Sequence, residues 1–249
     1  MSMSDALPDD FAGNENFEFA ALELAHNYRA ALLDEFSPFL RGRVLEVGAG
    51  VGHISQDLRK LGAVRSLTAI EPAPHLARAF RQRLPDLELI EGTIDAFQGG
   101  GPLDAIVSIN VLEHIQDDRE ELAKYQRLLA ARQGYLCLFV PARQEIYAPI
   151  DRDFGHHRRY MRPELKRLLE AAGFSLLRLD YFNCIGYFAW WLNFCLLKRR
   201  AFDARAVKLF DGTIFPLGHA LERAIVRPPI GQSLIAVARA HDTSPASAK

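Results

Sequence analysis

The sequence has few cysteines, almost no net charge and no apolar run at its start, and each absence excludes a class of protein. Its three cysteines, Cys137, Cys184 and Cys195, include no CxxC pair, which argues against a disulfide framework or a zinc ribbon and favours a reducing compartment. Thirty Lys and Arg against 31 Asp and Glu give a net charge of -1, so the basic field that nucleic-acid binding needs is missing. The opening residues are acidic and lack a signal-like apolar run, so we expect a cytoplasmic protein.

Short apolar runs alternate with stretches of helical spacing from residue 40 onward. The expected strands are 44–47, 66–70, 87–91, 104–109, 135–140, 175–181 and 232–238. The expected helices between them are 53–61, 74–84, 119–131 and 163–172. Strands that are apolar throughout and separated by helices predict an α/β protein with a doubly wound, mostly parallel sheet that is covered on both faces.

Two segments fall outside this alternation. Residues 1–39 combine a polar tail with helical spacing over Phe17–Phe36, and residues 182–230 interrupt the rhythm before the last strand. We therefore expect an N-terminal tail and helical cap over 1–39, a core over 40–181 and 231–240, and an inserted segment over 182–230.

The inserted segment opens with an apolar stretch, FNCIGYFAWWLNFCLL (182–197), followed by Lys-Arg-Arg. It is shorter than the roughly 20 residues that cross a bilayer. Three interpretations remain: a lid over an acceptor pocket, a contact between copies in a homodimer, or a peripheral membrane contact through 182–200. Seven bases against three acids give residues 182–230 a charge of +4, which mildly favours an anionic partner such as a lipid phosphate.

A glycine-rich turn, EVGAGVG (46–52), lies between a predicted strand and a predicted helix. Glycines there let the backbone approach a ligand at the positive end of the helix. A dinucleotide fingerprint would place its third glycine at His53, and the acid at Glu46 suits an ammonium better than a pyrophosphate. Glu71, at the end of the next strand, can accept hydrogen bonds from both hydroxyls of a ribose, although that spacing also permits NAD.

In these motifs the sequence resembles the class I S-adenosylmethionine-dependent methyltransferases, in particular the bacterial methyltransferase-domain 11/23 group. VLEVGAGVG, AIEP, IEGTIDAF, DAIVSINVLEHIQDD, GYLCLFVPA and RPELKRLLEAAGF follow one another in the order of that family. The resemblance implies S-adenosylmethionine as cofactor and a seven-stranded sheet whose last strand is antiparallel. It also implies that the cofactor contacts Glu46, Gly48, Ala49, Gly50, Gly52, Glu71, Pro72, Thr93, Ile94, Asn110 and Val111.

The loop DRDFGHHRRYMRPEL (151–165) follows the fifth strand, where this fold builds its acceptor side. His156 or His157 is expected to act as general base, because imidazole titrates near neutral pH. Arg158 or Arg159 would hold an anionic group of the acceptor. A solvated loop with paired charges is the alternative interpretation.

Further acceptor contacts are expected from Tyr160, Tyr181 and Trp190, and His114 is the second candidate for the base. The inserted segment is expected to leave the sixth strand at the opposite or a lateral edge of the sheet and to fold back over the site. Because Asn110 occupies the place where some ubiquinone-pathway O-methyltransferases carry a metal-binding acid, we expect no metal.

The expected reaction is O-methylation of a small-molecule, sugar or lipid-linked glycan acceptor. INVL at 109–112 lacks the (D/N)-P-P-(F/Y) motif of enzymes that methylate base amines. The alternatives are a nicotinamide-dependent oxidoreductase and a protein of this fold that binds the cofactor without catalysis.

Overall fold

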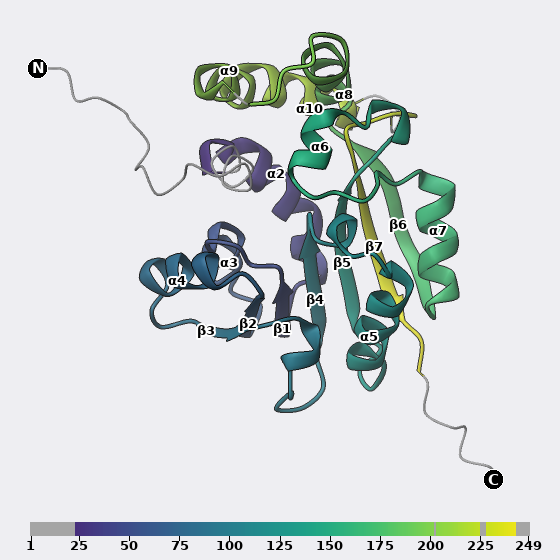
Figure 1. The fold of residues 1–249 in the computed structure, drawn as a ribbon. Helices are drawn as coiled ribbons and strands as arrows, with labels where there is room; N and C mark the ends of the chain where they lie inside the picture. The colour runs from purple at the N-terminus through teal and green to yellow at the C-terminus, as the bar shows by residue number, and fades with distance from the viewer. Residues whose placement is uncertain (1–22, 202, 225–227, 243–249) are drawn as a thin grey trace, which may run out of the picture.

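The computed structural model describes residues 23–201, 203–224 and 228–242. The expected tail over 1–16 and the first part of the expected helix over 17–36 lie outside these residues. The centre of the protein is a seven-stranded sheet in the order β3-β2-β1-β4-β5-β7-β6 (Figure 1). The strands are β1 (Gly42–Val47), β2 (Val64–Glu71), β3 (Glu88–Glu91), β4 (Ala105–Ile109), β5 (Tyr135–Pro141), β6 (Phe174–Phe182) and β7 (Ser233–Ala240).

The last strand, β7, lies between β5 and β6 and runs antiparallel to both. The other neighbouring pairs are parallel. The predicted doubly wound α/β sheet with an antiparallel last strand is therefore confirmed, and the seven expected strands match the observed ones to within a few residues.

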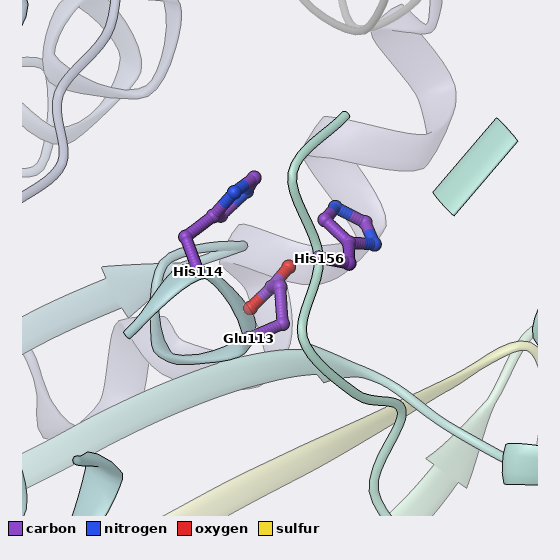
Figure 2. Close-up of side chains that lie close together, drawn as sticks. All are labelled: Glu113, His114 and His156. Atoms are coloured by element: carbon purple, nitrogen blue, oxygen red, sulfur yellow. The ribbon is translucent and has the colours of Figure 1, made fainter. Parts of the chain in front are cut away.

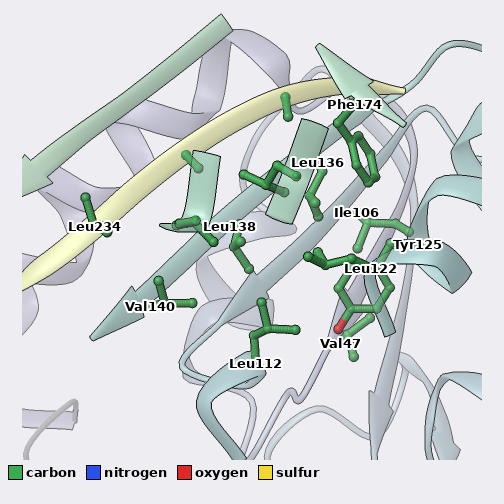
Figure 3. Packing of buried hydrophobic residues seen from close by; sticks show 14 of the residues in the cluster. Val47, Ile106, Leu112, Leu122, Tyr125, Leu136, Leu138, Val140, Phe174 and Leu234 are labelled. Atoms are coloured by element: carbon green, nitrogen blue, oxygen red, sulfur yellow. The ribbon is translucent and has the colours of Figure 1, made fainter. Parts of the chain in front are cut away.

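Helices cover both faces of the sheet, which explains why its strands are apolar throughout. They are α2 (His26–Phe36), α3 (His53–Leu58), α4 (Pro74–Arg83), α5 (Asp118–Ala130) and α7 (Arg162–Ala171). Successive residues of β5 alternate between two cores: Leu136 and Leu138 face the cluster around Tyr125 of α5, drawn in Figure 3, and Cys137 faces the cluster that includes Phe36 of α2. Strand β5 thus buries side chains on both faces of the sheet.

The segment between β6 and β7 forms three helices, α8 (Cys184–Trp190), α9 (Ala204–Leu209) and α10 (Phe215–Ala224), joined by π-helical turns at Trp191–Leu196 and Phe210–Ile214. In Figure 1 these helices gather above one end of the sheet, beside α2 and the short helix α6 (Pro149–Asp153). Asp211 ties the segment to α2, because its carboxylate accepts hydrogen bonds from the backbone N–H groups of Asn27 and Tyr28.

The expectation that this segment leaves β6 at the opposite or a lateral edge is wrong. Both β5 and β6 run antiparallel to β7, so they are parallel to each other. The carboxyl end of β6 therefore lies at the same edge as those of β4 and β5, and α8 begins there without a return crossing. No helix among the described residues is long and apolar enough to span a membrane.

Candidate active site

The glycine turn joins β1 to α3 through three residues in the left-handed region of backbone space. Gly48, Gly50 and Gly52 have φ values of 74°, 55° and 88°. A Cβ at Gly48 would lie closer than 3.0 Å to Cγ2 of Val111, in the loop after β4. At Gly52 a Cβ would press against Phe80. Glycine is therefore required both for the turn and for the close approach of two loops.

Glu46, near the end of β1, is buried beside this turn and accepts a hydrogen bond from the buried hydroxyl of Ser55 in α3. Burial raises the pKa of Glu46 to about 8, against the lowering effect of the Ser55 hydroxyl, and the nearby Glu71 carboxylate raises it further. A buried carboxyl with so high a pKa is ready to ionise when a cation approaches.

Glu71, the last residue of β2, is buried and holds the glycine turn in place. Its two carboxylate oxygens accept the backbone N–H groups of Gly50 at 2.8 Å and Ala73 at 2.9 Å. Burial raises the pKa of Glu71, and these two hydrogen bonds oppose the rise. Each oxygen keeps lone-pair capacity for a hydroxyl donor, as the predicted ribose contact requires.

The other predicted cofactor residues lie at the same edge of the sheet. Ala49 belongs to the glycine turn and donates its N–H to Ile70 O, while Pro72 directly follows Glu71. Thr93 is exposed and Ile94 is buried after β3. Asn110, after β4, has a φ of 52°, a left-handed conformation that asparagine tolerates better than most residues.

The loop after β5, predicted to bind the acceptor, is organised around one buried carboxylate. Asp151 accepts hydrogen bonds from Nε of Arg159 at 2.8 Å and from the backbone N–H of Ala148 at 2.8 Å. Its Oδ1 also lies 3.1 Å from Nδ1 of His156. The Arg159 guanidinium in turn lies over the ring of Trp190 in α8, 4.3 Å from its centroid. This network fixes His156 and links the loop to the inserted segment.

The remaining predicted acceptor residues have partners elsewhere. Arg158 pairs with Asp118 at the start of α5, and the Tyr160 hydroxyl donates to the same carboxylate. Tyr181 is buried in β6, where the Arg143 guanidinium lies over its ring. The ion pair of Arg158 with Asp118 is what the alternative interpretation, a solvated loop with paired charges, predicts for this residue.

Of the three candidate histidines, the structure brings two together. The rings of His114 and His156 have their centroids 4.6 Å apart in an edge-to-face arrangement. Glu113 is buried next to them, as Figure 2 shows. His157 is exposed, and its backbone N–H donates to the carbonyl of Glu113.

A cavity of about 410 Å³ connects these groups with the inserted segment. Asn110, Glu113 and His156 line it on the side of the sheet. Leu209 and Ile214, which are exposed, line it on the side of α9. Arg159 and Trp190 are the predicted acceptor residues that contribute to its wall.

Sequence reasoning did not assign roles to Ser55, Asp151 or Glu113. Ser55 lies in the first turn of the helix after the glycine turn, where a hydroxyl can reach the end of the preceding strand. Asp151 comes five residues before His156, and no periodicity connects them. Glu113 adjoins His114, but only its burial distinguishes it from a solvated helix-start acid.

Comparison with known proteins agrees with this architecture. The family described as a methyltransferase domain matches residues 19–179. No curated protein sequence matches the chain.

Two solved structures illustrate the similarity of fold. One belongs to the complex between the Haloferax volcanii Trm112 methyltransferase activator and a proposed methyltransferase, with 15% identity, a TM-score of 0.64, and coverage of 96% of this chain and 100% of that one. Another is an S-adenosylmethionine-dependent methyltransferase from Archaeoglobus fulgidus, with 17% identity, a TM-score of 0.56, and coverage of 90% and 99%. Because the family match spans more than half of its residues, the chain belongs to the methyltransferase domain family and is a class I S-adenosylmethionine-dependent methyltransferase.

Proposed function

We propose that this enzyme transfers the methyl group of S-adenosylmethionine to a hydroxyl of a lipid-linked acceptor at a membrane surface. The observation that carries the proposal is the cavity that runs from Glu113 and His156 to exposed apolar residues of the inserted segment. When bound, the cofactor supplies an activated methyl group, and the protein has to align the acceptor and exclude water.

The glycine turn and the two buried acids fit this cofactor. Glu46 offers a carboxylate to the amino group of its methionine part, and Glu71 offers acceptor positions to its ribose. Gly48 lets Val111, in the loop after β4, approach the turn closely. Asn110 lines the cavity, and its neighbour Val111 packs against Gly48 of the turn. An acceptor in the cavity would therefore lie next to the cofactor site.

Glu71→Ala is expected to lower the affinity for S-adenosylmethionine at least about tenfold, because hydrogen bonds to a charged group contribute roughly 1.5–3 kcal/mol each. Isothermal titration calorimetry measures the change, and circular dichroism checks the fold. The matched control is Glu88→Ala, an exposed glutamate at the other end of the neighbouring strand β3. Equal affinities for the Glu71→Ala and wild-type proteins would mean that the ribose binds elsewhere.

The surface of the inserted segment is apolar to an unusual degree. Nine of the ten exposed large apolar side chains among the described residues belong to it. They are Phe188, Trp191, Leu192, Leu196, Leu197, Leu209, Ile214, Leu217 and Leu221. A concentration of this kind marks an interaction site on a folded protein.

Basic side chains accompany these apolar residues and favour an anionic membrane over a second copy of the chain. Lys198, Arg199, Arg205 and Lys208 are exposed in the same segment. Two positively charged surfaces of two copies would repel each other, whereas anionic lipid headgroups attract them. Exposed apolar side chains next to basic ones are typical of helices that lie in a membrane interface.

The name of one structural neighbour supports a lipid acceptor. The mycolic acid cyclopropane synthase CmaA1, complexed with SAH and CTAB, has 18% identity and a TM-score of 0.54 over 84% of this chain. In our protein the apolar part of an acceptor would fill the cavity between α2, α8 and α9, and its hydroxyl would reach Glu113, His114 and His156. His156 is favoured over His157 as the general base, because its ring lines the cavity and is held by Asp151.

The test of membrane docking is flotation with phosphatidylglycerol-containing vesicles. We expect the protein to bind these vesicles and not vesicles of phosphatidylcholine alone. Leu196→Glu and Leu209→Glu should each weaken binding at least about tenfold, since a buried leucine contributes roughly 1.5–3 kcal/mol. Leu177→Glu is the matched control, because Leu177 is equally exposed but lies on β6, outside the inserted segment.

The test of acceptor class is release of S-adenosylhomocysteine with a lipid extract compared with the water-soluble fraction of the same cells. Turnover with the lipid extract supports the proposal. Turnover with the water-soluble fraction alone would contradict it. If gel filtration shows a dimer that forms through the apolar surface, that surface binds a second copy of the chain instead of a membrane. No turnover with any fraction would favour the alternative of cofactor binding without catalysis.

A further inference from the structure

Three side chains that commonly bind metal ions converge beside the cavity, and two of them, Glu113 and His156, line it. Glu113 and His114 follow β4, whereas His156 belongs to the loop after β5. One donor atom from each lies within 4.8 Å of those of the other two. In Figure 2 the side chain of Glu113 lies next to both imidazoles. Such ligands lie about 2.0–2.2 Å from a transition metal, so donor atoms this close to one another can share one ion.

We infer that Glu113, His114 and His156 form a binding site for one divalent first-row transition-metal ion. The inference departs from the expectation of no metal, which rested on Asn110 alone. That expectation considered ligands in the stretch after β4 and not a histidine from the loop after β5. The fold supplies this third ligand because β4 and β5 are neighbouring parallel strands whose carboxyl ends meet.

The orientation of His156 is that of a metal ligand. Its Nδ1 lies 3.1 Å from Oδ1 of Asp151, so the ring donates from Nδ1 and presents Nε2 as a ligand atom. Histidines that bind metals commonly make this contact with a second carboxylate, which fixes the ring and its tautomer. Arg159 compensates the charge of Asp151, which therefore need not bind the ion itself.

The two loops that carry the ligands are joined through their backbones. The N–H of His157 donates to the carbonyl of Glu113 at 2.8 Å. The Tyr160 hydroxyl, which donates to Asp118, also lies 3.2 Å from the carbonyl oxygen of Leu112. These bonds hold Glu113 and His156 at a fixed separation, and preorganised ligands lower the entropic cost of binding an ion.

The donor set selects the kind of metal. Two imidazoles and one carboxylate suit zinc, manganese, iron or cobalt ions, whereas magnesium and calcium prefer oxygen ligands. Three protein ligands leave coordination positions for other molecules, the arrangement found in catalytic rather than structural zinc sites. Since Glu113 and His156 line the cavity, those positions face its interior.

A metal ion at this place would bind the acceptor hydroxyl and lower its pKa, so that the oxygen attacks as an alkoxide. The bond that forms joins that oxygen to the methyl carbon, the bond that breaks joins the methyl carbon to the sulfonium sulfur, and the hydroxyl proton passes to solvent. With an ion bound, His156 is a ligand and cannot also be the general base, so the ion takes over activation of the hydroxyl. This role rests on the proposed function, but binding of the ion does not.

The inference is tested by metal binding to the chelator-treated protein, without any acceptor. We expect calorimetric titration with Zn²⁺ to show one site per chain, and Mg²⁺ to bind far more weakly. Co²⁺ should give visible absorption bands of a four- or five-coordinate ion. His156→Ala and Glu113→Gln should each weaken Zn²⁺ binding at least about thirtyfold, since even outer-shell changes cost 10–100-fold. The control, His157→Ala, changes an exposed neighbouring imidazole and should leave the affinity unchanged.

Three results would overturn the inference: binding no tighter than that of the His156→Ala protein, an equal loss in the His157→Ala protein, or a Co²⁺ spectrum identical to that of the ion in buffer. The melting temperature and S-adenosylmethionine affinity of each variant show whether it is folded. Metal binding without turnover of lipid would refute the proposed function alone. Full turnover of lipid by metal-free protein would refute the metal role alone.

Discussion

Gly48→Ala is expected to reduce the affinity for S-adenosylmethionine by at least about a hundredfold, which corresponds to roughly 2.7 kcal/mol. Two physical effects add. The residue has a φ of 74°, and a left-handed conformation costs an alanine about 1–2 kcal/mol. In addition, the new Cβ would collide with Cγ2 of Val111, so that either the turn or the loop after β4 has to move. Both segments lie where we place the cofactor.

The matched control is Gly62→Ala. Gly62 is exposed, has no positive φ, and has nothing within 4 Å of a Cβ. A second variant separates the steric effect from backbone strain: in Gly48→Ala/Val111→Ala the colliding methyl is gone, and the nearest remaining atom, Cβ of residue 111, lies 3.5 Å from the new one. Partial recovery of affinity is expected in calorimetry. Wild-type affinity in the single variant would show that the turn does not contact the cofactor.

The sheet, and the position of the proposed cofactor residues at its edge, could be predicted from the sequence because their signals are local. A strand that is buried on both faces needs a continuous apolar run, and a tight turn at the end of β1 needs glycine at Gly48 and Gly52. Glu46 and Glu71 lie at strand ends, so their place at the edge of the sheet follows from the strands alone. These features depend on residues adjacent in the chain.

The acceptor side could be predicted only in part, because it depends on contacts between distant segments. His156 meets Glu113 only because β4 and β5 are neighbours, and nothing in the spacing of the two residues says so. The position of α8 depends on β7 pairing antiparallel with both β5 and β6, which puts the carboxyl end of β6 at the same edge as that of β5. The roles of Arg158 and Arg159 likewise depend on Asp118 and Asp151, whose burial is a property of the folded loop.

Glu46→Gln is expected to have opposite effects on cofactor binding and on the stability of the cofactor-free protein. The affinity for S-adenosylmethionine should fall more than about a hundredfold, because breaking a buried ion pair costs roughly 3–5 kcal/mol. The free protein should instead become less sensitive to alkaline conditions, because the variant has no carboxyl group to ionise in an apolar place. The amide is nearly isosteric with the carboxyl and can still accept the hydrogen bond of Ser55.

The raised pKa of Glu46 determines how the stability of the cofactor-free protein changes with pH. The pKa of Glu46 rises from 4.5 to about 8 on folding, so the native state binds more protons than the unfolded state between these values. The free energy of unfolding contributed by this group therefore falls as pH increases through that window, and is fully retained only below about pH 4.5. Urea unfolding of the cofactor-free protein at pH 5, 6, 7 and 8 should show this decline in the wild type and a flatter profile in Glu46→Gln.

Cofactor binding provides a second, independent measurement of the protonation of the Glu46 carboxyl. At pH 7 the carboxyl of Glu46 is largely protonated in the free protein and has to lose its proton to pair with an ammonium, so binding should release protons. Titration calorimetry in buffers of different ionisation enthalpy measures that release, which should be smaller in Glu46→Gln and unchanged in Glu88→Gln. If the variant releases as many protons as the wild type, another group ionises on binding. The amino group of the cofactor would then lie away from the end of β1.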